Sequence, residues 1–538
     1  MELLGRSDTV FDVLIVGYGP AGATMANLLG KRGYSVAVFD QALEIYDKPR
    51  AITADQEVMR VLQECGLAEE VSRRTTPHPG TDFIGIEGQL IKCFYPAPPP
   101  SPLAWDPTWM FVQPELEATL RAGVARYPKV QEFLGYEFLE YSQGEDGVVA
   151  TVKQLARDTV FTIRGKYLLG CDGGRSTVRR QMEATIEDLA FDEWWMVVDA
   201  WMHGPIDLPP RCVQYCRPSR PGTYIVGPDN LRRWEIKMLP GETPDDFESD
   251  EAVLQVLSTF VDPTNLQVCR TAIYRFHALV VDEWQDGRVF LMGDAAHQMP
   301  PFLGQGLCAG IRDALNLAWK IDGVERLGYS KTLLNSYTEE RKRHVRTIVS
   351  HAKSFGLIIG ELDETAARRR DRELAELLAS GKAETVRQKF IPGLETGLIG
   401  RDTDQQIQVG AGELFVQPWI HSGDEFRRLD DLLPPGFLIV AGSSEVPNWF
   451  DASTNDALEK IGGRTVVIST APSPVNLPTL SLMERDGLFN QWLSSLGAKA
   501  AIIRPDHYVY GTAAGADELR RLIAQLAEHI TPAMAQAM

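Results

Sequence analysis

The chain has 538 residues, more than one hydrophobic core usually supports, so two to four domains or lobes are expected. A hydrophobic fraction of 44% and a charged fraction of 24% are those of an ordinary globular protein, so no long disordered region is expected. The formal net charge of −19 repels phosphate backbones and anionic membrane surfaces, which argues against nucleic-acid binding.

The sequence gives no sign of a membrane span or of an oxidising compartment. No apolar run approaches the roughly 20 residues that cross a bilayer, and the first residues lack the pattern of a cleavable leader. The seven cysteines form no C-x-x-C motif, and none follows Cys308. This pattern indicates a reduced cytoplasmic enzyme with neither a disulfide framework nor a zinc site, and no metal site is predicted.

The chain opens with the pattern of a strand, a helix and a second strand. Residues 11–16 (FDVLIV) form a nearly continuous apolar run, as expected of a parallel strand that is buried on both faces. A glycine-rich turn follows, then a helix from Ala21 to Arg32, with Gly33 as its stop. Residues 35–40 (SVAVFD) are predicted to form the second strand.

The turn after the first strand carries a G-x-G-x-x-G motif, Gly17-Tyr18-Gly19-Pro20-Ala21-Gly22. The first glycine allows the tight turn, the second lets a pyrophosphate approach the backbone, and the third lets helix and strand pack closely. Asp40 ends the next strand, where an acidic residue can accept hydrogen bonds from an adenosine ribose. The motif therefore predicts dinucleotide binding, with a merely structural glycine-rich turn as the alternative, and it does not distinguish NAD from FAD.

The middle of the chain changes character. Residues 193–239 contain strand-like runs, and within 231–238 Trp234, Ile236 and Met238 alternate with Arg233, Glu235 and Lys237. This alternation predicts an antiparallel strand with one buried face, and hence a second lobe built on an antiparallel sheet.

Helices and a further domain are expected after this lobe. Residues 307–388 have the pattern of amphipathic helices. Strands are predicted at 436–441 and 465–469, followed by a final helix with one apolar face formed by Leu519, Leu522, Ile523, Leu526 and Ile530. This part of the chain is predicted to form a separate α/β domain.

Two further motifs lie between these elements. Residues 169–180 (LGCDGGRSTVRR) carry D-G followed by S-x-x-R, and residues 288–307 carry a strand that ends in Gly293-Asp294 and continues through Pro300-Pro301 to Gly306-Leu307. With the first motif, they resemble the class A, single-component flavoprotein aromatic hydroxylases, the group of p-hydroxybenzoate and phenol hydroxylases. The 3-(3-hydroxyphenyl)propionate hydroxylases are the most similar, through residues 48–67, 112–120, 171–180, 231–242, 293–320 and 504–511.

The resemblance implies an α/β fold in three parts. A Rossmann-like FAD-binding domain of the GR2 type would comprise residues 1–180 and 270–390, and an antiparallel-sheet substrate lobe residues 181–269. Residues 400–538 would form a thioredoxin-like α/β domain. Because this last domain contains no cysteine, a redox role is excluded there, and we expect a structural role or a homodimer interface.

The resemblance also implies bound FAD and the residues that hold it. Asp294 would hydrogen-bond the ribityl chain, and the N–H groups of Gly306 and Leu307 would face the flavin pyrimidine edge. Asp172 would support both FAD and NAD(P)H. The full set implied to bind cofactor is Gly17, Gly19, Pro20, Ala21, Gly22, Asp40, Gln41, Arg50, Gln113, Asp172, Gly293, Asp294, Pro301, Gly304, Gly306 and Leu307. For Arg50, Gln113, Asp172 and Asp294 the alternatives are a surface salt bridge, a helix cap, a turn aspartate and a solvated loop carboxylate.

The implied reaction is hydroxylation of a phenolic substrate with NAD(P)H and O2 through a flavin C4a-hydroperoxide. The protein would orient the substrate and exclude water. The sequence leaves the catalytic group open among His297, Pro301, Tyr224 and Gln214, with Tyr215 as a further alternative. Trp194, Trp195, Met196, Trp234 and Phe302 are candidates for apolar walls, or simply core. Arg211, Arg217, Arg220 and Lys237 are candidates to pair with a substrate carboxylate, or simply solvated charges.

Three other functions share parts of this pattern. An FAD-dependent dehydrogenase or oxidase would use the same scaffold without NAD(P)H. A non-catalytic flavin-binding protein is disfavoured by the extended segment from Gly293 to Leu307. A flavin halogenase is disfavoured because the chain has no W-x-W-x-I-P motif. Fold alone does not separate these chemistries.

Overall fold

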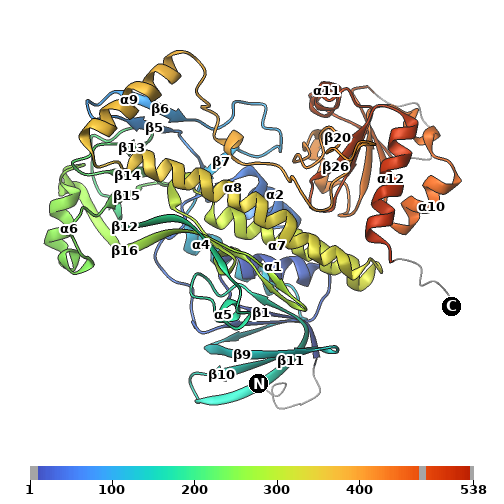
Figure 1. The fold of residues 1–538 in the computed structure, drawn as a ribbon, viewed down its shortest axis with the longest axis horizontal. Coiled ribbons are helices and arrows are strands. Elements are labelled where there is room, and N and C mark those ends of the chain that lie inside the picture. Colours follow the sequence, from blue (N-terminus) through green and yellow to red (C-terminus); the bar gives the residue numbers. More distant parts are fainter. Residues whose placement is uncertain (1–9, 472–479, 533–538) are drawn as a thin grey trace.

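The computed structural model describes residues 10–471 and 480–532 as three groups of elements (Figure 1). A parallel sheet with its helices lies in the centre and lower part of the view, a second sheet lies at the left, and the orange-to-red domain lies at the right. The start of the chain, for which the sequence predicts no leader, lies outside the described residues.

The predicted strand-helix-strand unit is confirmed. It consists of β1 (Val10–Val16), α1 (Pro20–Lys31) and β2 (Val36–Asp40). β1 pairs in parallel with β2 and with β11 (Thr159–Gly170), while β8 (Val130–Leu134) and β18 (Val289–Leu291) extend the parallel sheet on either side. The centre of β1 is fully buried, because α1 and its neighbours α4 (Gln113–Val124) and α7 (Gly306–Arg326) cover the sheet.

Parallel pairing brings three distant segments to one edge of this sheet. The carboxyl ends of β1, β11 and β18 lie next to one another, so the segments beginning at Gly17, Cys171 and Met292 follow neighbouring strands. Ligands of open α/β sheets bind at such an edge. The three motifs found in the sequence are therefore adjacent in space.

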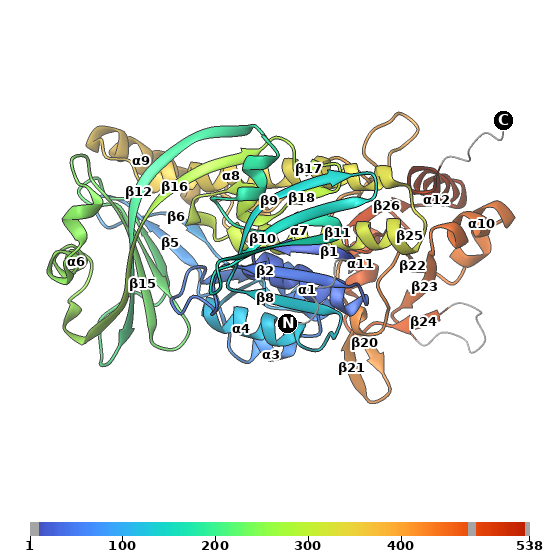
Figure 2. The same cartoon turned by 90° about the horizontal axis from the view of Figure 1, so that it is seen from below.

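The second sheet has the order β19-β16-β12-β15-β14-β13-β5-β6 and is antiparallel except for the pair β13 and β5, which confirms the predicted antiparallel lobe. Its strands are β5 (Thr81–Ile84), β6 (Leu90–Phe94), β12 (Ile186–Met202), β13 (Cys212–Tyr215), β14 (Gly222–Val226), β15 (Leu231–Lys237), β16 (Leu266–Val281) and β19 (His297–Gln298). The sheet extends beyond residues 181–269, since strands from both sides of that segment join it. The long strands β12 and β16 arch from this lobe toward the first sheet (Figure 2).

One face of the second sheet is closed by a helix. Met196, Val198, Trp234 and Ile236 pack with Val253 and Leu257 of α6 (Asp250–Leu257) in an apolar core. The opposite face is turned toward the first sheet. The helical prediction for residues 307–388 is confirmed by α7, α8 (Ser336–Ile359) and α9 (Glu364–Ala379), and α8 packs against β16.

The carboxyl-terminal domain contains a five-stranded mixed sheet of order β24-β23-β22-β25-β26. Its elements are β22 (Leu438–Ala441), α10 (Ala452–Lys460), β23 (Arg464–Ser469), β24 (Leu480–Met483), α11 (Leu488–Ser495), β25 (Ala500–Ile503), β26 (Val509–Ala513) and α12 (Ala516–Ile530). The predicted apolar face of the last helix is buried from Leu519 to Ile530. Both predicted strands and this helix are thus confirmed.

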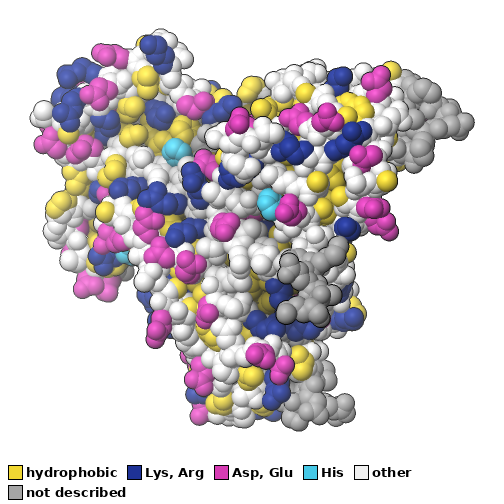
Figure 3. Space-filling model, turned by 45° about the vertical axis from the view of Figure 1, so that its right-hand side comes forward, with side chains coloured by type: hydrophobic (Ala, Val, Ile, Leu, Met, Phe, Trp, Pro, Cys, Tyr) yellow, Lys and Arg dark blue, Asp and Glu magenta, His cyan; other side chains and the backbone are white. Residues whose placement is uncertain are grey.

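Shorter elements complete the described chain: α2 (Gln56–Glu64), α3 (Ala68–Ser72), α5 (Thr177–Gln181), β3 (Thr53–Asp55), β4 (Thr76–Pro77), β7 (Thr108–Met110), β9 (Tyr136–Gly144), β10 (Gly147–Gln154), β17 (Gln285–Asp286), β20 (Trp419–Ser422) and β21 (Glu425–Arg428). β9 and β10 form an antiparallel extension of β11. Basic and acidic side chains are interspersed on the face shown in Figure 3. No helix within residues 10–471 and 480–532 combines the length and apolarity that a membrane crossing needs.

Candidate functional site

A cavity of about 790 Å³ lies between the edge of the parallel sheet and the inner face of the second sheet. Its walls include all three sequence motifs as well as residues of β12, β13, β14 and β15. Of the sixteen residues predicted to bind cofactor, fifteen line this cavity. The remaining one, Gly22, packs against the carbonyl group of Gly17. The fold therefore gathers the predicted set at one site.

The glycine-rich turn fits a pyrophosphate group. Gly17 has φ of +99°, and an added methyl group there would lie 2.3 Å from the carbonyl oxygen of Cys171. At Gly22 it would lie 2.1 Å from the carbonyl oxygen of Gly17. Gly19, at the start of α1, has no atom within 4 Å of such a methyl group. The first and third glycines thus permit close packing, while the second leaves open space at a helix amino terminus, where anions bind.

Asp40 lies at the end of β2 beside this turn. Its Oδ2 accepts a hydrogen bond from the Tyr18 backbone N–H at 2.8 Å, and its Oδ1 accepts one from the Ala42 N–H, also at 2.8 Å. These contacts fix the carboxylate on the cavity wall. A carboxylate has further lone pairs, so Asp40 can still accept ribose hydroxyl groups.

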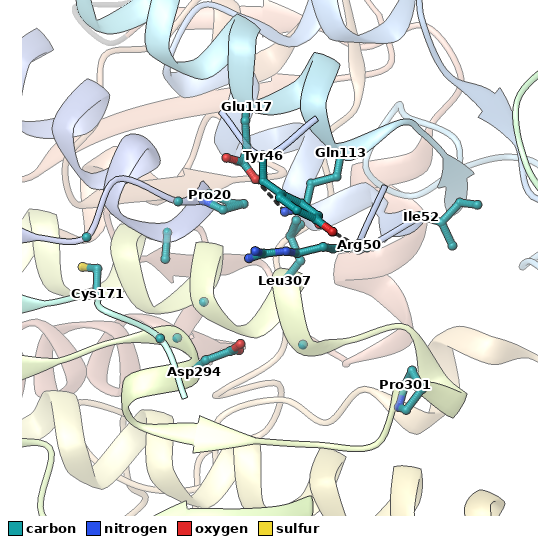
Figure 4. Close-up of a pocket in the computed structure, with 18 of the residues that line it drawn as sticks. Pro20, Tyr46, Arg50, Ile52, Gln113, Glu117, Cys171, Asp294, Pro301 and Leu307 are labelled. Atoms are coloured by element: carbon teal, nitrogen blue, oxygen red, sulfur yellow. Dashed lines mark hydrogen bonds between the residues drawn. The ribbon is translucent and has the colours of Figure 1, made fainter. Parts of the chain in front are cut away.

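Asp294 follows β18 and faces the cavity with no hydrogen bond to its carboxylate from any described residue. The side chain is open to the cavity, but the protein around it desolvates the carboxylate and so raises its pKa. The preceding Gly293 is held by Asp313, which accepts its N–H at 3.0 Å. Figure 4 shows Asp294 directed into the space that Arg50 and Pro20 border. A fixed carboxylate without a protein partner suits a ligand with several hydroxyl groups.

Arg50 and Gln113 lie on the opposite side of this space (Figure 4). The Arg50 guanidinium stacks over the Tyr46 ring at 4.5 Å from its centroid. Gln113 begins α4, accepts a hydrogen bond from the Ala51 N–H at 2.5 Å and donates one to Glu117 at 2.6 Å. Arg50 thus remains available to an anion, while Gln113 holds the Arg50 segment in place.

Asp172 acts as a helix cap. Its Oδ2 accepts hydrogen bonds from the backbone N–H groups of Thr177 and Val178 at the start of α5, whereas its buried Oδ1 has no partner in the described structure. The residue also lines the cavity, so capping α5 does not take it away from the site.

The loop from Pro300 to Gly306 leads into the amino terminus of α7. Pro301, Gly304, Gly306 and Leu307 line the cavity. Gly304 adopts a left-handed conformation with φ of +62°, which a side chain disfavours. The first N–H groups of the 21-residue helix α7 are therefore presented to the cavity.

The inner face of the second sheet forms the other wall. Strand register places Gln214, Thr223, Glu235 and Val197 in one row, since each pairs with the next across β13, β14, β15 and β12. All four residues line the cavity. Side chains two positions away share this face, which adds Cys212, Ile225, Arg233 and Arg270.

This wall is polar and buried, so the prediction that β15 has one buried face is wrong. The Trp234 face packs against α6, and Arg233 and Glu235 on the other face are only 3% and 4% exposed. These two side chains face the cavity inside the protein and not the outer solvent. Arg233 and Arg270 both contact Asp199, at 2.7 and 2.9 Å, and Arg233 also donates to the backbone carbonyls of residues 49 and 50.

Glu235 lies beside this ion cluster without a close partner. Its Oε1 is 3.9 Å from Arg233 Nη1, and it accepts no hydrogen bond from a described residue. Burial, opposed by the nearby guanidinium of Arg233, raises the pKa of Glu235 to about 7. A carboxyl group on this wall can therefore exchange a proton near neutral pH.

The candidates for the catalytic group are distributed differently. Gln214 and Pro301 line the cavity, and Gln214 accepts a hydrogen bond from Thr223 at 2.5 Å. His297 lies outside the lining, 2.8 Å from Asp313 and packed against Trp284. Tyr224 lies on the far face of its sheet, in the core that α6 closes, and Tyr215 packs against that same core.

The candidates for apolar walls and for carboxylate pairing divide in the same way. Phe302 lines the cavity; Trp194, Trp195, Met196 and Trp234 do not. Arg220 pairs with Glu242 and Lys237 with Glu193, both at 2.6 Å, while Arg211 lies 3.6 Å from Asp82 and Arg217 donates to the carbonyl of residue 259. None of these four cations lines the cavity.

Sequence reasoning missed several polar residues of the cavity: His78, Thr81, Glu235, Arg270, Tyr274 and Arg387. The alternation in β15 contained a signal for Glu235, because a run of charged residues opposite a buried face can line a site. His78 and Arg387 carry no local signal. They lie 309 residues apart and meet only through the fold.

Comparisons with known proteins agree with this arrangement. A family model described as "FAD binding domain" matches residues 10–352, and one described as "HcaD C-terminal domain" matches residues 412–529. A probable NADH-specific resorcinol 4-hydroxylase of Rhodococcus jostii is 31% identical, with 98% of this chain and 97% of that protein covered. A 3-(3-hydroxy-phenyl)propionate/3-hydroxycinnamic acid hydroxylase of Comamonas testosteroni is also 31% identical, with 93% of each covered.

Solved structures share the fold. The flavin-dependent monooxygenase PieE, in complex with FAD and substrate, superposes with a TM-score of 0.80 at 21% identity, over 97% of this chain and 100% of that one. Aklavinone-11 hydroxylase, in a ternary complex with FAD and aklavinone, gives 0.75 at 21% identity with the same coverage. The mixed α/β architecture therefore matches that of FAD-containing hydroxylases along nearly the whole chain.

Proposed function

Because the chain belongs to the family of FAD-dependent aromatic hydroxylases, we propose that it hydroxylates a phenolic compound, such as a 3-hydroxyphenyl carboxylic acid, with NAD(P)H and O2. One observation carries this proposal: a single cavity joins a dinucleotide turn at the sheet edge to a buried polar wall on a second lobe. The turn suits a cofactor, and the wall suits a small aromatic molecule that bears polar groups.

The residues around the turn would hold the cofactor. Gly19 and the start of α1 would receive the pyrophosphate, Asp40 the adenosine ribose, and Asp294 the ribityl hydroxyl groups. Arg50, Asp172 and the amino terminus of α7 would supply further contacts. When bound, FAD would supply the chemistry that takes up hydride from the nicotinamide and activates oxygen. The protein's own groups position the substrate, exclude water and hold protons.

The finer architecture belongs to the same proposal. The central domain, residues 10–180 and 270–390, would be a Rossmann-like domain of the GR2 type, and the strands around 181–269 a substrate lobe. The domain after residue 400 would be thioredoxin-like. Its mixed β-sheet, with helices between the strands, supports this assignment. Without cysteines its role would be structural or in a homodimer.

The proposal is tested by a substrate panel. The purified protein should show the absorbance of oxidised flavin and should consume NADH or NADPH faster when a hydroxyphenyl acid or resorcinol is added. Measuring hydrogen peroxide beside the hydroxylated product separates coupled turnover from leakage. Flavin reduction by the substrate itself, without NAD(P)H, would favour a dehydrogenase or an oxidase instead.

Replacement of Asp294 tests the cofactor assignment. Asp294→Ala should weaken FAD binding roughly tenfold or more, because a carboxylate that receives hydroxyl donors is lost. FAD affinity is measured by titrating the apoprotein with flavin, and Asp286→Ala, on the exposed strand β17, is the matched control. Unchanged affinity in Asp294→Ala would remove the assignment.

A further inference from the structure

Arg387 is a buried cation that has no anionic side chain as a partner in the described part of the chain. Seven arginines are buried among the residues that the structure describes. Six of them have a carboxylate oxygen within 3.0 Å: Arg60, Arg233, Arg270, Arg312, Arg341 and Arg504. Arg387 has none within 4.0 Å. Among the described residues, the carboxylate whose charge acts on Arg387 is Asp55, which already pairs with Arg312 at 2.5 Å.

The contacts that Arg387 makes leave part of its guanidinium free. Nη2 donates to the carbonyl of Leu303 at 2.5 Å, Nη1 lies 3.5 Å from His78 Nε2, and the buried Nε has no partner in the described structure. A buried charge without an ionic partner is costly, and proteins normally pair it. Arg387 lines the cavity, so the missing partner can come from a ligand.

His78 adds a second donor to this corner. The Gly80 backbone N–H donates to His78 Nδ1 at 2.9 Å, so Nδ1 is an acceptor and the proton of the neutral ring is on Nε2. Nε2 therefore carries the donor of the ring, 3.5 Å from Arg387 Nη1. Among the described residues, the other contact of Nε2 is with the Cys212 sulfur at 3.9 Å, a weak acceptor. Burial and the adjacent guanidinium lower the pKa of His78, which keeps the ring neutral.

Both donors are fixed before any ligand binds. The backbone N–H of Arg387 donates to the carbonyl of Tyr95, which follows β6, and the backbone N–H of His78 donates to the carbonyl of Thr108. The side-chain amide of the neighbouring Gln388 donates to the hydroxyl of the same residue, Thr108, at 2.8 Å. A preorganised pair of donors binds an acceptor with little ordering cost.

We propose that Arg387 and His78 form an oxyanion subsite that binds a carboxylate or phenolate oxygen of the aromatic substrate. This inference rests on the proposed function and names a group that the substrate must present. Guanidinium and imidazole N–H donors that lie 3.5 Å apart on a cavity wall, with no carboxylate to pair with the guanidinium, favour an anionic oxygen over a neutral hydroxyl group. Arg387 and His78 would thus be specificity-determining residues of the substrate end of the cavity.

The test measures ligand binding to the oxidised holoenzyme by perturbation of the flavin absorbance. Three ligands are compared: 3-(3-hydroxyphenyl)propionate, its primary amide, and 3-phenylpropionate. Losing a charge-assisted contact in Arg387→Met should raise Kd by roughly 10- to 100-fold for the ligand that places an oxyanion there. A loss with both acids but not with the amide identifies the carboxylate. A loss with both phenols but not with 3-phenylpropionate identifies the phenolate.

Controls separate this role from a structural one. Arg211→Met changes a half-exposed cation of the same lobe outside the cavity and should leave all three Kd values unchanged. Arg387→Lys keeps the charge and should restore part of the affinity. The Leu303 carbonyl loses a donor in Arg387→Met, but no carboxylate loses its partner, so the variant should retain flavin. If it does not retain flavin, His78→Asn, which keeps an acceptor for the Gly80 N–H but withdraws the donor, should raise the same Kd several-fold.

Two results would overturn the inference. The first is binding of all three ligands by the Arg387 and His78 variants within about twofold of the wild type. The second is a shift of the flavin spectrum or reduction potential without ligand, combined with unchanged ligand affinity, because Arg387 would then serve the cofactor. A wild-type enzyme that turns over no phenol would instead refute the proposed function.

Discussion

Glu235 occupies an environment that few carboxylates have. It is buried, it lines the cavity, and its closest cation is 3.9 Å away, whereas the neighbouring Asp199 takes the close contacts of two arginines. The two carboxylates of this cluster therefore have different roles. Asp199 holds the arginines, and Glu235 remains able to accept a proton from a bound hydroxyl group.

The raised pKa of Glu235 predicts a pH-dependent cost to folding. The pKa rises from an ordinary value of 4.5 to about 7, so the protonated form is favoured in the folded protein. The contribution of the protonated Glu235 to the free energy of unfolding is complete below about pH 4.5 and is lost as pH rises through about 7. Glu235→Gln should therefore gain up to about 3 kcal/mol of unfolding free energy relative to wild type between about pH 5 and pH 8.

Urea unfolding at the two pH values measures this difference. Glu87→Gln, which alters an exposed carboxylate of the same lobe, should show no such pH-dependent gain. A constant difference between Glu235→Gln and the wild type at both pH values would contradict an elevated pKa at this residue.

At this scale the sequence predicted more of the cavity wall around the glycine-rich turn than of the wall on the second sheet. Gly17, Gly19 and Asp294 lie in short motifs whose spacing is set by local backbone geometry, so their roles can be inferred from neighbouring residues. Arg387 and His78 come together only because a linker pairs with β6, and no local pattern encodes that pairing. The charged residues of β15 were visible, but their burial depends on a domain contact.

The strand-turn-helix element at the amino terminus assigns different tasks to its glycines. Gly17 requires a positive φ and has no room for a side chain, whereas Gly19 has an ordinary φ of −74° and open space above it. Stability and cofactor binding can therefore be separated within one motif.

The pair of substitutions Gly17→Ala and Gly19→Ala tests this separation. Gly17→Ala should destabilise the apoprotein by about 2 kcal/mol or more, because of its φ and the close Cys171 carbonyl. Gly19→Ala should leave the thermal unfolding of the apoprotein nearly unchanged but weaken FAD binding roughly tenfold, since the methyl group fills the space for the pyrophosphate. Equal losses of stability in both variants would argue against an open cofactor space at Gly19.

At the scale of the whole molecule, the carboxyl-terminal domain is joined to the catalytic body by buried charges. Arg504, which follows β25, contacts Glu340 of α8 at 2.7 Å, and Glu340 also accepts from Lys320 of α7 at 2.8 Å. Tyr508 donates to Glu57 on α2, which shares Arg312 with Asp55. Because α7 begins at the cavity, the domain supports the helix that borders the proposed flavin site.

The sequence predicted this domain as a unit, but its attachment could not be inferred. The apolar face of α12 and the strands of its sheet have local periodicity, so they were predictable. The Arg504–Glu340 contact joins residues 164 positions apart, and each residue alone has the sequence pattern of a solvated charge. Long-range ion pairs become visible only when the fold brings the two elements together.

Arg504→Met tests whether the attachment stabilises the molecule. The substitution leaves Glu340 and Asp506 buried with fewer partners, so it should reduce the unfolding free energy by about 3–5 kcal/mol. Arg343 lies on α8, like Glu340, and forms an exposed pair with Glu395; Arg343→Met should cost no more than about 1 kcal/mol. Urea unfolding, followed through both tryptophan fluorescence and flavin release, measures the two effects. If Arg504→Met loses flavin at lower urea than wild type, the carboxyl-terminal domain holds α7 in place; a domain that only covers the surface would leave flavin release unchanged.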